Sequence, residues 1–314
     1  MNKKRDYRSA GSLTTLVRAA FGEDAAGRLV RSDTDRRGSY RPLKGGYFAD
    51  VYRIILRDGR RVILKLAPES EEGFLRYEKN MLKRETEMMR VIRERSTVPV
   101  PEVYSFDDSR TLIPTAYYFM EEIPGVCGGL TEENYEETGR IARQLAMIDN
   151  AYFGFPDAQE TQSTSWAETL RRIFELLCAD MEISPSAERL RGIVAGVRER
   201  MNSPRVQSAL EEVKVPGLVH NDLWEGNFMT DHGKITGVID FGRSVWGDPL
   251  MEEWFFAGNE KFMRGYGKTS FTKNERLRMA LYALLFNMER TSNCGELREE
   301  QIEEIHTLLE KIQQ

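Results

Sequence analysis

Three polar side chains between residues 219 and 248 most constrain what this chain can fold into and do. Asp222 follows a short apolar run, Asn227 stands five residues after it, and Asp240 ends a second apolar run. In phosphoryl transfer one carboxylate orients the attacking hydroxyl, while an amide oxygen and a second carboxylate are hard ligands for Mg²⁺. The spacing therefore predicts a phosphoryl-transfer site at the ends of rigid strands.

Each of these residues also has a structural explanation. Aspartate is common in turns and at strand ends, so one such residue alone is more often structural than catalytic. Here the cluster is preceded by a glycine pair, Gly45-Gly46, and by a lysine in a β-rich run, Lys65. The combination favours a kinase.

Residues 44–66 carry the pattern of a turn followed by a hairpin. Two β-rich runs, within 47–56 and over 61–66, are separated by Asp58-Gly59. An Asp-Gly pair between two such runs is a strong signal for a tight hairpin. The glycines before it indicate a further strand, which makes three antiparallel strands.

Two more strands and one helix complete this half of the chain. The strands are expected at 103–106 and 117–120, around a polar turn, and the helix over 69–95, where apolar residues recur on one face. We therefore expect a five-stranded antiparallel sheet that carries one helix.

After Pro124-Gly125 the composition becomes mostly helical. Helices are expected at 131–148, 165–182, 186–201, 248–257, 272–292 and 296–312. Thr272 and Glu275 have the spacing of a capping box, and short strands at 218–220 and 234–239 interrupt the helices.

The pattern predicts an α+β chain of two lobes. The N-terminal, nucleotide-binding lobe spans 1–122, with 1–38 as an extension, and the helical C-terminal lobe spans 123–314.

The catalytic cluster resembles the aminoglycoside phosphotransferase and choline kinase family. Its His-x-Asp-x-x-x-x-Asn pattern is met from His220 to Asn227, and its Ile-Asp-Phe/Trp element resembles Ile239-Asp240-Phe241. The resemblance covers about residues 40–290. It implies a bilobal, protein-kinase-like fold.

Two positions depart from the family's pattern. The Gly-Asp-Pro-x-x-Asp pattern ends here in Glu252, and Asn221 stands where many members carry glycine. These departures concern the subfamily and leave the chemistry unchanged.

The resemblance implies roles for the cluster. Asp222 is the catalytic base or orients the acceptor hydroxyl, and Asn227 and Asp240 bind Mg²⁺. His220 supports the loop through hydrogen bonds and does not act as a base.

The resemblance also assigns the nucleotide site, whose co-substrate is ATP or GTP. Lys65 contacts the α- and β-phosphates and pairs with Glu85 on the next helix, with Glu87 as the competing candidate. Gly45 and Gly46 begin the loop over the phosphates, where main-chain N–H groups can approach an anion.

The same resemblance places the hinge that contacts the purine at Met120, Glu121 and Ile123.

The acceptor side is acidic and aromatic. Trp224, Glu225, Glu252 and Glu253 are the candidate pocket residues. Carboxylates attract a polyamine, and aromatic faces hold a quaternary ammonium. The glutamates of the last helix either line this pocket or form a solvated face, and helical spacing favours the second.

One motif does not fit its apparent function. Residues 265–269 resemble the end of a P-loop, but Phe262 stands where that motif requires glycine, and a helix precedes it. We expect an ordinary helix end there.

Composition excludes other classes of protein. The net charge of −5 gives no basic face for nucleic acid, and no stretch approaches ~18 uninterrupted apolar residues. Three widely spaced cysteines fit a reducing compartment. We expect a cytoplasmic monomer or homodimer that binds neither nucleic acid nor membrane.

The sequence therefore predicts a Mg²⁺-dependent kinase that transfers the γ-phosphate of ATP or GTP to a small-molecule hydroxyl. An aminoglycoside-like, cationic antibiotic leads among the acceptors, and choline, a sugar amine or another metabolite is the alternative. A nucleotide-binding pseudokinase is disfavoured because every expected catalytic group is present. A protein kinase is disfavoured because only four residues separate Gly242 from Gly247.

Overall fold

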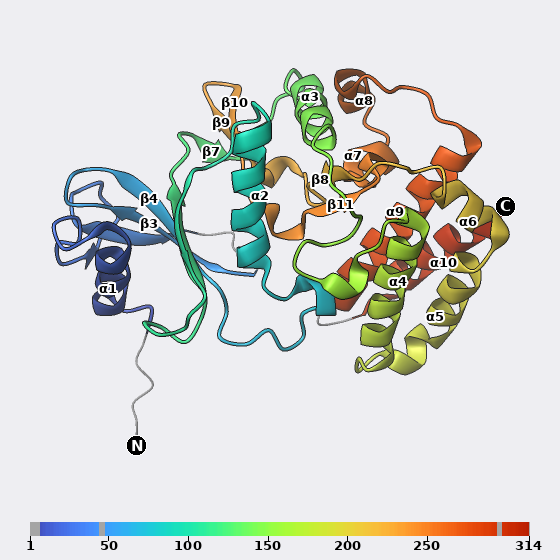
Figure 1. Ribbon diagram of the computed structural model, residues 1–314, viewed down its shortest axis with the longest axis horizontal. Coiled ribbons are helices and arrows are strands. Elements are labelled where there is room, and N and C mark those ends of the chain that lie inside the picture. Colours follow the sequence, from blue (N-terminus) through green and yellow to red (C-terminus); the bar gives the residue numbers. More distant parts are fainter. Residues whose placement is uncertain (1–6, 44–47, 294–296, 314) are drawn as a thin grey trace.

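The computed structural model describes residues 7–43, 48–293 and 297–313, so Gly45 and Gly46 lie outside the described residues. A sheet with helices on its two faces forms the N-terminal half, and a mostly helical assembly forms the C-terminal half (Figure 1). This confirms the expected two-lobed α+β fold.

In the described part of the chain the large sheet has six strands, in the order β1-β2-β3-β4-β6-β5. They are β1 (Val30–Arg31), β2 (Ser39–Leu43), β3 (Asp50–Ile55), β4 (Arg61–Leu66), β5 (Val103–Asp107) and β6 (Tyr117–Glu121). The five expected strands, β2 to β6, pair antiparallel. β1 pairs parallel with β2 and adds a sixth strand, which is too short to leave a pattern in the sequence.

The side chains of β4 alternate between the two faces of the sheet. Val62, Leu64 and Leu66 are buried in a core with helix α1 (Ala10–Phe21) on one face. Ile63 belongs to the other core, which includes helix α2 (Met81–Arg95). Because neighbouring side chains on a strand point to opposite faces, Lys65 points toward α2.

The helix expected over 69–95 begins only at Met81. A short 3-10 turn, η1 (Arg76–Glu78), and Asn80 in the left-handed region, with φ 58°, precede it. The main-chain N–H of Arg76 donates to Asp180, far along the chain. Residues 69–80 are therefore held by tertiary contacts instead of a helical ladder, which composition alone does not reveal.

The C-terminal half is built from eight α-helices in the described residues. They are α3 (Tyr135–Ala146), α4 (Trp166–Glu182), α5 (Ala187–Met201), α6 (Pro204–Leu210), α7 (Glu253–Phe256), α8 (Glu260–Tyr266), α9 (Lys273–Asn293) and α10 (Glu299–Gln313), with 3-10 turns η2 (Gln159–Thr161), η3 (Glu225–Asn227), η4 (Phe241–Arg243) and η5 (Pro249–Met251). The capping box at Thr272 and Glu275 is present, with reciprocal bonds of 2.8 and 3.1 Å.

The helix expected over 248–257 is two short pieces, η5 and α7. Between them Glu252 has an extended backbone, with ψ 130°. The Asp248 side chain accepts a hydrogen bond from Leu250 N and caps only the first piece. α6, which the sequence reading did not predict, has only two turns.

Two small sheets flank the candidate catalytic residues of the C-terminal half. One has the order β10-β9-β7 and the other pairs β11 with β8. Their strands are β7 (Val126–Cys127), β8 (Gly217–Val219), β9 (Phe228–Asp231), β10 (Lys234–Val238) and β11 (Val245–Gly247). β7, β9 and β11, each of four residues or fewer, were not predicted.

The segment that resembles a P-loop is the end of α8, as expected. A Cβ on Gly265 would lie 1.9 Å from the main-chain oxygen of Glu136, so glycine is needed where α8 crosses α3. Gly267 ends the helix with φ 84°, the usual left-handed cap.

The terminal helix α10 packs on α5 and α9, at the end of the molecule away from the sheet (Figure 1). Ile305, Leu309 and Ile312 are buried in that contact. Among the described residues no helix is long and apolar enough to cross a membrane.

Candidate active site

Lys65 joins the sheet to both halves of the candidate site. Its Nζ lies 2.7 Å from Glu85 Oε1 on α2 and 3.4 Å from Asp240 Oδ1 after β10. Burial alone would lower the pKa of Lys65, but the carboxylates of Asp240 and Glu85 outweigh it and raise the pKa. The lysine therefore stays charged and can bind an anion.

Glu85, and not Glu87, makes this contact. The Glu85 side chain is 2% exposed, whereas Glu87 is only partly buried and lies elsewhere on the helix. Residues two apart on a helix do not share a face, which separates the two candidates.

Asp222 and Asn227 face each other across the loop after β8. Asn227 Nδ2 donates to the Asp222 main-chain oxygen at 2.7 Å and to Asp222 Oδ2 at 3.0 Å. Burial raises the pKa of Asp222 to about 7, against the opposing charge of Arg243. The amide of Asn227 thus orients the Asp222 carboxylate, and an amide does not accept a proton from a carboxyl group.

The pairing of β9 with β10 brings Asn227 beside Asp240. Phe228 pairs with Val238, and Ile239 N donates to the Asn227 main-chain oxygen at 3.0 Å. The Asp240 side chain remains 47% exposed, and the charge of Lys65 lowers its pKa against the effect of desolvation.

These positions fit a hard cation. The hydrogen bonds of Asn227 use its amide nitrogen and leave Oδ1 as the atom that can face a cation, beside the ionised carboxylate of Asp240. Carboxylate and amide oxygens are ligands that Mg²⁺ accepts.

Two loop residues have a left-handed backbone, Asn221 with φ 62° and Asp240 with φ 68°. Glycine and asparagine adopt this conformation with least strain. This explains why Asn221 can stand where many members of the resembling family carry glycine.

His220 is a structural support of the loop. It is fully buried, burial lowers its pKa to about 4, and its Nε2 donates to the Ile239 main-chain oxygen at 3.0 Å. Its ring packs on Phe241 with centroids 4.5 Å apart. This neutral histidine ties the two catalytic strands together.

Glu252 lies beneath the catalytic loop, where it is 3% exposed. Its Oε1 accepts from His220 N at 2.7 Å, and burial raises its pKa to about 8. It therefore supports the loop from below and does not line an open acceptor surface.

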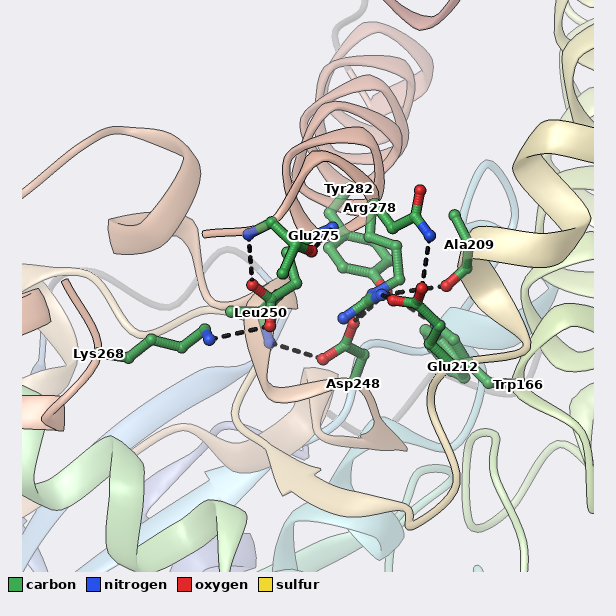
Figure 2. A network of polar contacts seen from close by, with 11 residues as sticks. Trp166, Ala209, Glu212, Asp248, Leu250, Lys268, Glu275, Arg278 and Tyr282 are labelled. Carbon is green, nitrogen blue, oxygen red and sulfur yellow. Dashed lines mark hydrogen bonds and ion pairs between the residues drawn. The ribbon is translucent and has the colours of Figure 1, made fainter. Parts of the chain in front are cut away.

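Asp248 anchors the segment that carries Glu252 (Figure 2). Its Oδ2 accepts from Arg278 Nε and from Tyr282 Oη, each at 2.7 Å, and the Trp166 indole donates to Tyr282 Oη at 2.8 Å. The buried network fixes η5 against α9.

The other candidate acceptor residues surround Asp222. Trp224 is 53% exposed, and Glu225 accepts a hydrogen bond from the Tyr135 hydroxyl. Glu253 lines a small cavity together with Asp222 and Phe256.

The candidate hinge residues lie where β6 leaves the sheet. Met120 and Glu121 end β6, and Ile123 packs its side chain into the space left by Gly237 on β10. The hinge is thereby held against the strand that leads to Asp240.

Two buried arginines near the site were missed by the sequence reading, Arg84 and Arg243. Arg84 is 1% exposed, and Arg243 pairs with Glu78 and, at 3.3 Å, with Glu289. For Arg84 a signal existed, because it stands three residues after Met81 and four before Met88 on the buried face.

Residues 39–282 match the model of the phosphotransferase enzyme family. The chain belongs to this family. It is therefore a kinase, an ATP-binding transferase that phosphorylates a hydroxyl group of a small molecule.

The curated relatives are ketoamine kinases by name. A probable ketoamine kinase of Enterococcus faecium is 25% identical over 291 residues, which cover 88% of this chain and 98% of that protein. A probable ketoamine kinase of Vibrio cholerae is 25% identical over 58% of this chain and 64% of that protein.

Solved structures share the protein-kinase-like fold. A putative fructosamine-3-kinase from Haemophilus somnus has a TM-score of 0.66 at 15% identity, covering 96% of this chain and 97% of that one. A thermostable mutant of the aminoglycoside phosphotransferase APH(4)-Ia, in ternary complex with ADP and hygromycin B, has a TM-score of 0.56 at 17% identity, covering 87% and 92%. At these identities the likeness concerns the fold alone.

Proposed function

We propose that this kinase transfers the γ-phosphate of ATP to a hydroxyl of a ketoamine, a ketose linked to an amine, with Mg²⁺ as cofactor. The observation that carries the chemistry is the convergence of Lys65, Asp240 and Asp222 from three separate segments at one cleft. The curated ketoamine kinases, one aligned over nearly its whole length, support the acceptor class.

The nucleotide side consists of the sheet, the hinge and α2. Lys65, held by Glu85, neutralises charge on the α- and β-phosphates, and main-chain groups of Met120, Glu121 and Ile123 contact the purine. Asn227 and Asp240 hold the Mg²⁺ ion, which, when bound, neutralises phosphate charge. We assign the phosphate loop to Gly45 and Gly46.

Asp222 acts on the acceptor. Its carboxylate, oriented by Asn227, accepts a hydrogen bond from the attacking hydroxyl and receives its proton as the new P–O bond forms. The bond between the γ-phosphorus and the bridging oxygen breaks in the same step, and ADP leaves. A pKa near 7 lets the group be ionised before transfer and hold the proton afterward.

The surroundings of Asp222 suit an acceptor that carries an amine. Glu225 and Glu253 supply negative charge, and the exposed indole of Trp224 offers an apolar face to a sugar ring. The buried Glu252 is assigned to loop support instead.

This proposal favours the sugar-amine acceptor over the aminoglycoside-like antibiotic that the sequence reading preferred. The relatives aligned over most of the chain are ketoamine kinases, whereas the aminoglycoside enzyme is similar in fold only. The nucleotide proposed is ATP, and the lobe boundary is proposed at residue 122.

An acceptor panel tests the proposal. Release of ADP from ATP, or of GDP from GTP, is measured with and without Mg²⁺, and with an N-alkyl fructosamine, hygromycin B or choline as acceptor. We expect Mg²⁺- and ATP-dependent turnover with a kcat/KM at least tenfold higher for the fructosamine. A higher value for hygromycin B or choline would refute the acceptor class but leave the kinase, whereas ADP release that depends on no acceptor would contradict both.

A further inference from the structure

The segment from Arg76 to Glu85 is attached to the C-terminal half of the molecule by side chains that the catalytic mechanism does not use. Arg84 precedes Glu85 on α2, and its side chain is 1% exposed. A buried guanidinium is costly unless its donors are satisfied, so its partners show what this position requires.

The Arg84 guanidinium donates hydrogen bonds to three separate segments. Nε donates to Asp157 Oδ1 at 2.5 Å, Nη1 to the Gly242 main-chain oxygen at 3.1 Å, and Nη2 to the Tyr77 main-chain oxygen at 2.5 Å. The guanidinium also lies 4.5 Å from the centre of the Phe155 ring. Asp157 is itself nearly buried, with 7% of its side chain exposed.

Tyr77 lies in η1, just before α2, but the other partners belong to the C-terminal half. Asp157 and Phe155 lie in the loop between α3 and α4, and Gly242 lies in η4, two residues after Asp240. Figure 1 shows α2 standing between the sheet and the helical half, and α2 packs directly on η4.

A second group of contacts fixes the turn that leads into α2. The Tyr77 hydroxyl donates to Glu289 on α9 at 2.8 Å, and Glu78 pairs with Arg243. The Arg76 guanidinium contacts Asp180 on α4 at 2.7 Å. Each of the residues 76, 77, 78 and 84 thus reaches the C-terminal half.

We propose that Arg84 is a positioning residue for phosphoryl transfer. It fastens α2 to the C-terminal half and holds the backbone that follows Asp240, so that Glu85 and Asp240 stay at a fixed separation with Lys65 between them. Through this contact α2 is held to the C-terminal half, and the Lys65–Glu85 pair joins the large sheet to α2.

The test compares Arg84→Met, the double variant Arg84→Met/Asp157→Asn, Arg84→Lys and the control Arg90→Met. Arg90 is an exposed arginine of the same helix. The double variant removes both charges and so avoids leaving Asp157 buried and unpaired. Affinity for ATP is measured by calorimetry with and without Mg²⁺, and amide hydrogen exchange is measured over residues 81–95. Kinetic constants use whichever acceptor the wild type turns over, so the test does not depend on the ketoamine proposal.

If Arg84→Met or the double variant folds, we expect at least a tenfold loss in its kcat/KM for ATP and faster amide hydrogen exchange in α2. The acceptor KM should stay within twofold, and Arg90→Met should match the wild type. Should both Met variants fail to fold, Arg84→Lys decides the test, because one ammonium cannot reach all three acceptors. We then expect a smaller loss in kcat/KM for ATP, again with an acceptor KM within twofold of the wild type. A folded Arg84 variant that is less stable but keeps wild-type ATP affinity, kinetics and α2 exchange would overturn the proposal. An equal rise in KM for ATP and in KM for the acceptor would also overturn the proposal.

Discussion

The ammonium of Lys65 lies 3.4 Å from the carboxylate of Asp240, although 175 residues separate them in the sequence. Lys65 comes from the centre of the large sheet, and Asp240 follows a strand of a small sheet in the other half. Their contact joins the two halves of the molecule at the proposed nucleotide site. The following predictions depend on how that junction and its neighbours are held.

Replacing Glu85 should weaken ATP use, because Lys65 would lose the partner that orients it. For Glu85→Gln we expect a rise of tenfold or more in KM for ATP, measured in steady-state assays. Glu87→Gln, two residues further along the helix, is the matched control and should stay within twofold of wild type. Equal effects of the two substitutions would contradict the assignment of Glu85.

Replacing Asp222 should remove transfer but spare nucleotide binding. Asp222→Asn cannot accept the hydroxyl proton, so we expect kcat to fall on the order of 10²–10⁴-fold, while calorimetry finds ATP affinity within about threefold. Asp231→Asn, on the exposed end of β9, controls for a lost surface charge. Near-wild-type turnover of Asp222→Asn would refute its role.

Glu252 should make folding stability fall as the pH rises. In the unfolded protein the pKa of this carboxyl is ~4.3. Folded, it keeps its proton up to a pKa of about 8 because it is buried. Between these values the folded state binds more protons, so Glu252 makes the free energy of unfolding decrease with increasing pH, by on the order of 5 kcal/mol in total.

The variant Glu252→Gln keeps the acceptor for His220 N but cannot ionise. Urea unfolding across that pH range should therefore show the variant gaining stability relative to wild type as the pH rises. Parallel curves for the two proteins would mean that Glu252 does not carry the shifted pKa.

Asn221 should tolerate glycine better than alanine, because its φ of 62° lies in the left-handed region. We expect Asn221→Ala to lose about 1 kcal/mol of unfolding free energy relative to Asn221→Gly. Thermal or urea unfolding measures the difference. Equal stability of the two variants would contradict a requirement for this backbone conformation.

Much of the site could be predicted from sequence because it depends on local patterns. Asp222, Asn227 and Asp240 stand at fixed spacings after apolar runs, and the resemblance of the Arg-Glu-x-x-Met-Met pattern to the family's favoured Glu85 over Glu87. The hairpin at Asp58-Gly59 likewise follows from its turn residues, and β3 and β4 pair there as expected.

What escaped prediction depends on contacts between distant segments. The start of α2 at Met81 follows from the attachment of residues 76–78 to α4, α9 and η4, which no local pattern records. Glu252 was predicted to line the acceptor pocket, yet it is buried under the loop, where it accepts a hydrogen bond from His220 N.

The most direct test of the account is mass-spectrometric detection of a phosphorylated N-alkyl fructosamine. The wild-type protein and Asp222→Asn are each incubated with this acceptor, ATP and Mg²⁺. We predict a singly phosphorylated product with the wild type and at most traces with the variant. Absence of that product from the wild-type reaction, or equal amounts from both proteins, would contradict the account.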